Sequence, residues 1–105
     1  MIKVYRENNP VDHEKPYRIF IDNIAVFDLL ENDIKSINLE PGKHIIKAKS
    51  DKYVSNELEF IETSEGIVEF IVEPDYTNNM LSKLFTSTIY GKQGLKVSLK
   101  KEFYI

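Results

Sequence analysis

The sequence predicts an all-β protein: an antiparallel β-sandwich of about seven or eight strands. Short apolar runs alternate with turn residues between positions 17 and 72, at intervals of roughly eight to twelve residues. Within most runs, apolar and polar residues alternate with the period of two that is typical of half-buried strands. Helical spacing occurs only near residues 79–86, where a short C-terminal helix is expected. The 105 residues fit a single domain, 1–105.

The first strands are defined by their alternation and by the turns between them. Residues 2–6 alternate apolar and polar, and residues 17–21 are apolar on both parities, which suggests that both faces of this strand are covered. Asp22 and Asn23 separate that run from the next one, residues 24–30. Both residue types tolerate positive φ, so a tight hairpin turn is expected there.

The middle of the chain predicts a second hairpin. Residues 34–39 and 44–49 are strands on either side of Pro41 and Gly42. Proline presets φ at the second position of a turn, and glycine supplies positive φ at the third. Residues 51–56 are expected to form a loop.

The second half continues the alternating pattern. Leu58 and Phe60 alternate with glutamates, which we assign to the solvent face together with the other strand glutamates; the set is Glu57, Glu59, Glu62, Glu69 and Glu73. Gly66 marks a turn, after which positions 68, 70 and 72 face the core. The final strand begins at Leu95, with positions 95, 97 and 99 at core parity.

Charge is distributed unevenly along the chain. The net charge is -3, yet residues 80–105 contain five lysines and one glutamate. Such asymmetry fits either a basic tail or a last strand that pairs with an acidic neighbour. We favour the second interpretation, because the lysines alternate with core-type residues.

The absence of cysteine and of a long apolar stretch limits the chemistry and the cellular location expected of this protein. The chain contains no cysteine, which excludes disulfides and thiolate metal sites. It also lacks an apolar stretch long enough for a signal peptide or a membrane span. We therefore expect a cytoplasmic protein, or an envelope-associated one if a signal has been removed.

No residue pattern predicts catalysis, and we expect a protein that is not an enzyme. Nucleophilic catalysis needs a nucleophile and a base, and only His13 and His44 offer an imidazole. His44 follows a turn, where a structural role is the simpler interpretation. Paired carboxylates would need a cleft, which a sandwich of this size has little material to build. The four glycines match no phosphate-binding fingerprint.

No cofactor or metal is expected either. Asp12, His13 and Glu14 are adjacent on one loop, whereas zinc sites draw their ligands from separated positions. Acidic and amide residues also gather at 22–23 and 28–33, as they do in calcium sites of sandwich loops. The twelve-residue calcium pattern is absent, and these residues are explained as turn formers.

Two further ligand classes, nucleic acid and sugar, fit the composition less well. The C-terminal lysines and aromatics combine charge with stacking surfaces, but the pI of about 5.4 argues against nucleic acid. The six tyrosines and six phenylalanines include no obvious sugar platform, because most lie at core parity and tryptophan is absent.

The order of motifs resembles the PEGA-like bacterial β-sandwich domains over residues 17–73. The resemblance rests on the hairpin ending in Asp22-Asn23, on the run 37–44 that contains Pro41 and Gly42, and on Tyr53-Val54-Ser55. It implies a transthyretin-like or immunoglobulin-like sandwich without enzymatic activity, often envelope-associated. The chain departs from the pattern at Asn23, where the family prefers glycine, and in the extension 74–105.

The function predicted from these observations is a non-catalytic protein-interaction module, with self-association through the C-terminal strand. The alternative is a carbohydrate- or calcium-binding module. Edge strands offer unpaired main-chain groups to partners. The expected contact residues are those of the basic strand and its apolar end: Lys96, Lys100, Phe103, Tyr104 and Ile105.

Overall fold

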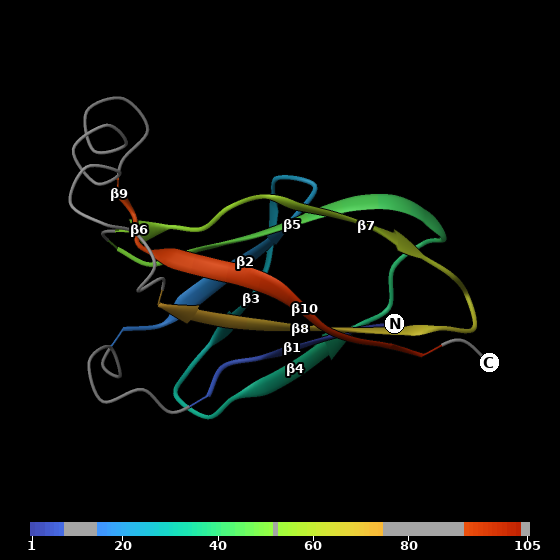
Figure 1. Ribbon diagram of the computed structural model, residues 1–105, viewed down its shortest axis with the longest axis horizontal. Helices are drawn as coiled ribbons and strands as arrows, with labels where there is room; N and C mark the ends of the chain where they lie inside the picture. The colour runs from blue at the N-terminus through green and yellow to red at the C-terminus, as the bar shows by residue number, and fades with distance from the viewer. Residues whose placement is uncertain (8–14, 52, 75–91, 104–105) are drawn as a thin grey trace.

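The computed structural model describes residues 1–7, 15–51, 53–74 and 92–103 (Figure 1). Within these ranges the protein is all-β, and its strands form two sheets, which fits a β-sandwich. The predicted helix at 79–86, the loop at 12–14 and the last two residues lie outside the described residues. No helix in the described part of the chain is long and apolar enough to cross a membrane.

Ten strands lie in the described ranges, and eight of them have four residues or more. The two short strands were not predicted: β6 falls within the expected loop 51–56, and β9 precedes the final strand. The strands are β1 (Ile2–Tyr5), β2 (Tyr17–Ile21), β3 (Ile24–Leu29), β4 (Ile34–Ile37), β5 (Gly42–Lys49), β6 (Tyr53–Val54), β7 (Leu58–Glu62), β8 (Ile67–Pro74), β9 (Lys92–Gln93) and β10 (Leu95–Phe103).

Sheet A contains four strands in the order β10-β8-β1-β4. β1 is antiparallel to β4 and parallel to β8, so the start of the chain lies inside the sheet. Sheet B has the order β3-β2-β5, and the other side of β5 pairs first with β7 and then with β6. Figure 1 shows the two sheets as layers, with β5 and β7 above and β8 and β10 below.

The core lies between the sheets and follows the predicted parity. Phe70 is fully buried on β8, and its ring packs edge-on against Phe60 of β7 at 4.9 Å between centroids. Val68 and Val72 are buried beside it, as expected. Burial of alternate residues between the sheets holds the two sheets together, because removing apolar surface from water is the main favourable contribution to folding.

The predicted hairpin between residues 34–39 and 44–49 is wrong, because β4 pairs with β1 in sheet A whereas β5 pairs with β2 and β7 in sheet B. The turns themselves lie where they were predicted. Asp22 and Asn23 have φ of 52° and 67°, the two positive values of a type I′ hairpin turn. Gly42, after Pro41, has φ of 127°, which L-residues with side chains rarely adopt. At the β7–β8 turn, the Gly66 N–H donates to the Thr63 carbonyl at 3.4 Å.

The assignment of the strand glutamates to solvent was wrong for Glu62 and Glu69. Glu62 shares the parity of Phe60 and is 1% exposed, and its Oε1 accepts a hydrogen bond from the Met1 ammonium at 2.6 Å. Glu69 is 9% exposed, and the Tyr5 hydroxyl donates to its Oε1 at 2.6 Å. A buried carboxylate is tolerated where a charge or hydrogen bond compensates for its lost hydration.

The backbone cost of the β2–β3 turn can be measured with two variants of Asn23. Both Asn23→Ala and Asn23→Gly remove the bond in which Lys47 Nζ donates to Asn23 Oδ1 at 2.8 Å. Only alanine also bears the cost of a Cβ at positive φ, about 1 kcal/mol. We expect Asn23→Gly to exceed Asn23→Ala in free energy of unfolding by about this amount in urea titrations. Equal stability of the two variants would contradict the turn geometry.

Candidate functional site

The outer edge of β10 is the part of the described structure best placed to meet a partner. β10 is nine residues long and forms one end of sheet A, where its ladder partner is β8. An edge strand presents N–H and C=O groups on its outer side that can pair with another chain. Which of these groups are already satisfied therefore decides what the edge can do.

The chain enters β10 by crossing from sheet B. β9 runs parallel to β6, and the Gly94 N–H donates to the Val54 carbonyl at 3.2 Å. A Cβ at Gly94 would overlap the ring of Tyr53. The crossing therefore requires glycine at this position, because the main chain passes against an aromatic face.

The Asn56 carboxamide closes the edge of β10 at Val97. Its Nδ2 donates to the Val97 carbonyl at 3.0 Å, and the Val97 N–H donates to its Oδ1 at 2.9 Å. Ser55 holds this segment in place: its hydroxyl accepts from the Ala48 N–H at 2.8 Å and donates to the Asn56 carbonyl at 2.7 Å. The carboxamide thus takes the place that a neighbouring strand would occupy.

Beyond Val97, no described strand pairs with the outer side of β10. In antiparallel pairing, residues alternate between those whose main-chain groups face the neighbouring strand and those whose groups point away. The Val97 groups point away from β8 toward Asn56, so those of Leu99, two residues on, point outward as well. Among hydrogen bonds between described residues, none reaches this side of Leu99. Its side chain is also 50% exposed.

Leu99 was expected in the core, and that part of the prediction was wrong. It lies opposite the buried Phe70 and keeps the parity of Val97, yet half of its surface is accessible. The pairing register shifts between Leu99 and Lys101, so β10 is irregular at this point. A bulge of this kind bends the strand and alters the direction of its side chains.

The predicted contact residues that can be placed lie along this strand. Lys96 is exposed and opposite Glu73 of β8, consistent with pairing between a basic strand and an acidic neighbour. The Lys100 ammonium lies 4.0 Å from the centroid of the Tyr5 ring, on the outer face of sheet A. Phe103 is the last residue of β10, opposite Ile67. Tyr104 and Ile105 lie outside the described residues.

His44 has the structural surroundings expected for it. Its Nδ1 lies 2.6 Å from Asp22 Oδ2 and its Nε2 lies 2.7 Å from the Glu40 carbonyl. Both partners are acceptors, so the protonated ring satisfies both by donating from each nitrogen. The hydrogen bond to Asp22, followed by the one to Glu40, raises the pKa of His44. The same bond to His44, with a second from the Ile45 N–H, lowers the pKa of Asp22.

The described residues contain no metal-binding cluster, and the chain has no match among known proteins. Within the described ranges, no group of three or more histidine, aspartate or glutamate side chains is arranged to hold a metal ion. The chain matches no protein-family model, no curated protein and no solved structure.

The Asp22–His44 contact predicts a pH dependence of stability. Because the folded-state pKa of His44 is raised above its ordinary 6.5, the contribution is present below pH 6.5 and is lost as pH rises through the folded pKa. Because that of Asp22 is lowered below 3.8, its contribution is present above pH 3.8 and is lost as pH falls through the folded pKa.

Urea titrations from pH 3 to 9, at roughly unit steps, test this dependence. Relative to His44→Gln, the wild type should gain most stability between the two ordinary pKa values and lose that gain toward pH 9. A difference that stays constant across this range would show that the contact does not titrate.

The closure at Val97 is tested by Asn56→Asp. Aspartate can still accept from the Val97 N–H but places an anionic oxygen against its carbonyl. We expect a loss of about 1–3 kcal/mol in the free energy of unfolding, the usual effect of breaking a part-buried hydrogen bond and leaving a group unsatisfied. Asn38→Asp is the control for charge. If both variants lose the same amount, the carboxamide does not close this edge.

Proposed function

We propose that this protein is a non-catalytic interaction module that self-associates through β10. The observation that carries the proposal is the open main-chain edge at Leu99 beside an apolar side chain that is 50% exposed. Main-chain pairing supplies affinity in such contacts, and burial of the apolar side chain supplies further driving force.

Twofold symmetry explains why a second copy suits this edge. If an axis passes beside Leu99, the strand meets its own copy in antiparallel orientation. Each Leu99 N–H then donates to the Leu99 carbonyl of the other copy, and two four-stranded sheets A become one sheet of eight strands. An axis at Leu99 also sets Lys101 of each copy opposite Val97 of the other, where the Asn56 carboxamide already fills the edge. The main-chain pairing is therefore confined to the two hydrogen bonds between the Leu99 residues.

The proposal also covers the family of this protein and its cellular location. The type I′ turn at Asp22-Asn23 and the positive φ of Gly42 support a PEGA-like sandwich of transthyretin-like or immunoglobulin-like type. The absence of cysteine is compatible with a cytoplasmic protein. The single domain then acts as a scaffold that presents its last strand.

Sedimentation equilibrium of Leu99→Lys tests self-association. The wild type should change with concentration from 12.3 kDa toward twice that mass. A lysine at position 99 adds a charge where two copies meet, so we expect its dissociation constant to rise at least about tenfold.

Ile24→Lys is the matched control. Ile24 is 67% exposed at the β2–β3 hairpin of sheet B, remote in the pairing order from β10. It should associate like the wild type. A wild type that remains at the monomer mass throughout, or equal weakening by both lysine variants, would overturn the proposal.

A further inference from the structure

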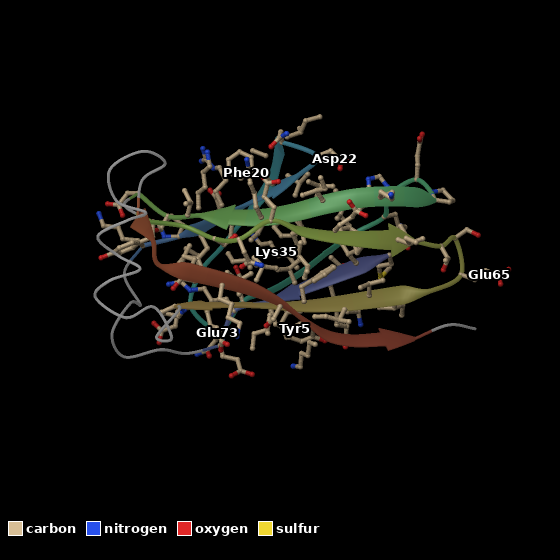
Figure 2. All side chains as sticks on the ribbon, turned by 45° about the horizontal axis from the view of Figure 1, so that its top comes forward. Tyr5, Phe20, Asp22, Lys35, Glu65 and Glu73 are labelled. Carbon is tan, nitrogen blue, oxygen red and sulfur yellow. The ribbon has the colours of Figure 1, made fainter. Side chains whose placement is uncertain are left out.

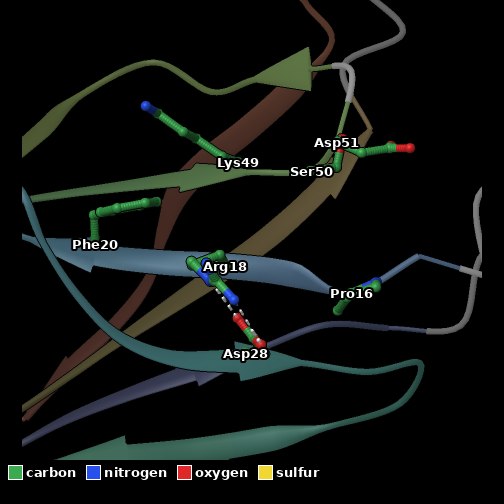
Figure 3. Close-up of a pocket in the computed structure, with 7 residues that line it drawn as sticks. All are labelled: Pro16, Arg18, Phe20, Asp28, Lys49, Ser50 and Asp51. Carbon is green, nitrogen blue, oxygen red and sulfur yellow. Dashed lines mark hydrogen bonds and ion pairs between the residues drawn. The ribbon is translucent and has the colours of Figure 1, made fainter.

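A shallow hollow lies on the outer face of sheet B, on the surface that faces away from the core. Its volume is about 300 Å³, at the lower end of the range for small-ligand pockets. Figure 3 shows its lining, with Phe20 at one end, Pro16 at the other and Arg18 between them. The lining residues are Pro16, Arg18, Phe20, Asp28, Lys49, Ser50 and Asp51.

Strand periodicity explains how these side chains meet. Pro16, Arg18 and Phe20 are two residues apart, so they lie on one face of β2 and its approach. The register places Arg18 between Asp28 of β3 and Lys49 of β5. Three adjacent strands therefore bring one guanidinium, one carboxylate and one ammonium into a row across the sheet.

A bulge leaves space beside Phe20. The β2–β3 register shifts between Ile19 and Phe20, and Phe20 lies opposite Ala25, an exposed residue with the smallest side chain after glycine. Bulges are frequent beside binding sites because they change the direction of side chains. A larger residue opposite Phe20 would cover the ring, whereas alanine leaves it accessible from that side.

The lining holds two cations and two carboxylates, and both carboxylates are already paired. Arg18 Nε pairs with Asp28 Oδ1 at 3.0 Å, and Lys15 pairs with Asp51 at 3.7 Å. Among the described residues, no carboxylate lies within ion-pair distance of Lys49. Its Nζ lies instead 5.1 Å from the centroid of the Phe20 ring. A second ammonium, that of Lys47, lies 5.7 Å from the same centroid.

We propose that this hollow binds an acidic sugar residue, a hexuronate of a carboxylated polysaccharide. The apolar face of the sugar ring packs on Phe20, and its carboxylate lies against Lys49. Its hydroxyls donate to the carboxylates of Asp28 and Asp51 and accept from Arg18. This mixture of an aromatic surface, acceptors and one cation without a carboxylate in ion-pair range among the described residues matches a ligand that offers an apolar face, several donors and a single negative charge.

The carboxylates in the lining favour a sugar over nucleic acid. A phosphodiester chain offers negative charge but few donors, so Asp28 and Asp51 would repel it. The guanidinium beside Asp28 lowers the pKa of this carboxyl, which therefore stays ionised at neutral pH. Hydroxyl groups, by contrast, gain strong hydrogen bonds from ionised carboxylates.

The proposal is tested by titrating trigalacturonate into the protein and following amide chemical shifts. We expect saturable shifts centred on Arg18, Phe20 and Lys49, and weaker binding at higher salt because one ion pair contributes. Lys49→Gln should weaken binding about tenfold. Lys43→Gln removes the same charge from the same face of β5, outside the hollow, and should bind like the wild type.

Ala25→Leu provides a second variant that keeps every charged group and covers the Phe20 ring. It should also weaken binding, with the unchanged spectrum of the core as proof of folding. The absence of saturable shifts at millimolar trigalacturonate would overturn the proposal. Equal affinity for neutral cellotriose, tighter binding of a single-stranded oligonucleotide, or equal effects of Lys43→Gln and Lys49→Gln would also overturn it.

Discussion

The two hydrogen bonds between the Asn56 carboxamide and Val97 hold the last strand in its place. They join the segment between β6 and β7, two strands of sheet B, to the edge of sheet A. The chain has just crossed between the sheets at Gly94, where the Tyr53 ring leaves no space for a side chain. One amide thus positions β10 against β8 and satisfies the edge that would otherwise be exposed at this point. The open edge at Leu99 exists because this closure extends no further.

The buried guanidinium of Arg6 is also compensated by hydrogen bonds, whereas Glu62 Oε2 is buried without such a partner among the described residues. Arg6 is 3% exposed, and its guanidinium donates to the carbonyls of Lys15 and Leu29 at 2.6 and 2.8 Å. It also stacks on Tyr17, with 3.7 Å between Cζ and the ring centroid. Such contacts fix loops to strands without enlarging the core, which suits a small domain. Figure 2 shows the opposite arrangement, with many charged side chains directed outward from both layers.

Local features could be predicted from the sequence, whereas contacts between distant segments could not. The hairpin at Asp22-Asn23 and the core parity of Phe70 follow from φ preferences and from alternation, which are local properties. The parallel pairing of β1 with β8 joins residues more than 60 positions apart, and no local pattern encodes it. The burial of Glu62 could have been predicted, because Glu62 shares the parity of Phe60. The contact of Asn56 could not, since it depends on where β10 lies. The hollow around Phe20 depends in part on the alternation of side chains along a strand, which can be read from the sequence. It also depends on the register between strands, which cannot.

The domain has two surfaces that bear on its proposed function: an edge limited by Asn56 and a face carrying a hollow. Among the described residues, β10 is closed at Val97 and open at Leu99. Amide hydrogen exchange at low and high protein concentration tests this most directly. The Val97 amide should be protected at both concentrations, and the Leu99 amide only at the higher one, where a second strand covers it. Protection of Leu99 that does not depend on concentration, or exchange at Val97 as fast as at Leu99 in dilute protein, would contradict the claim.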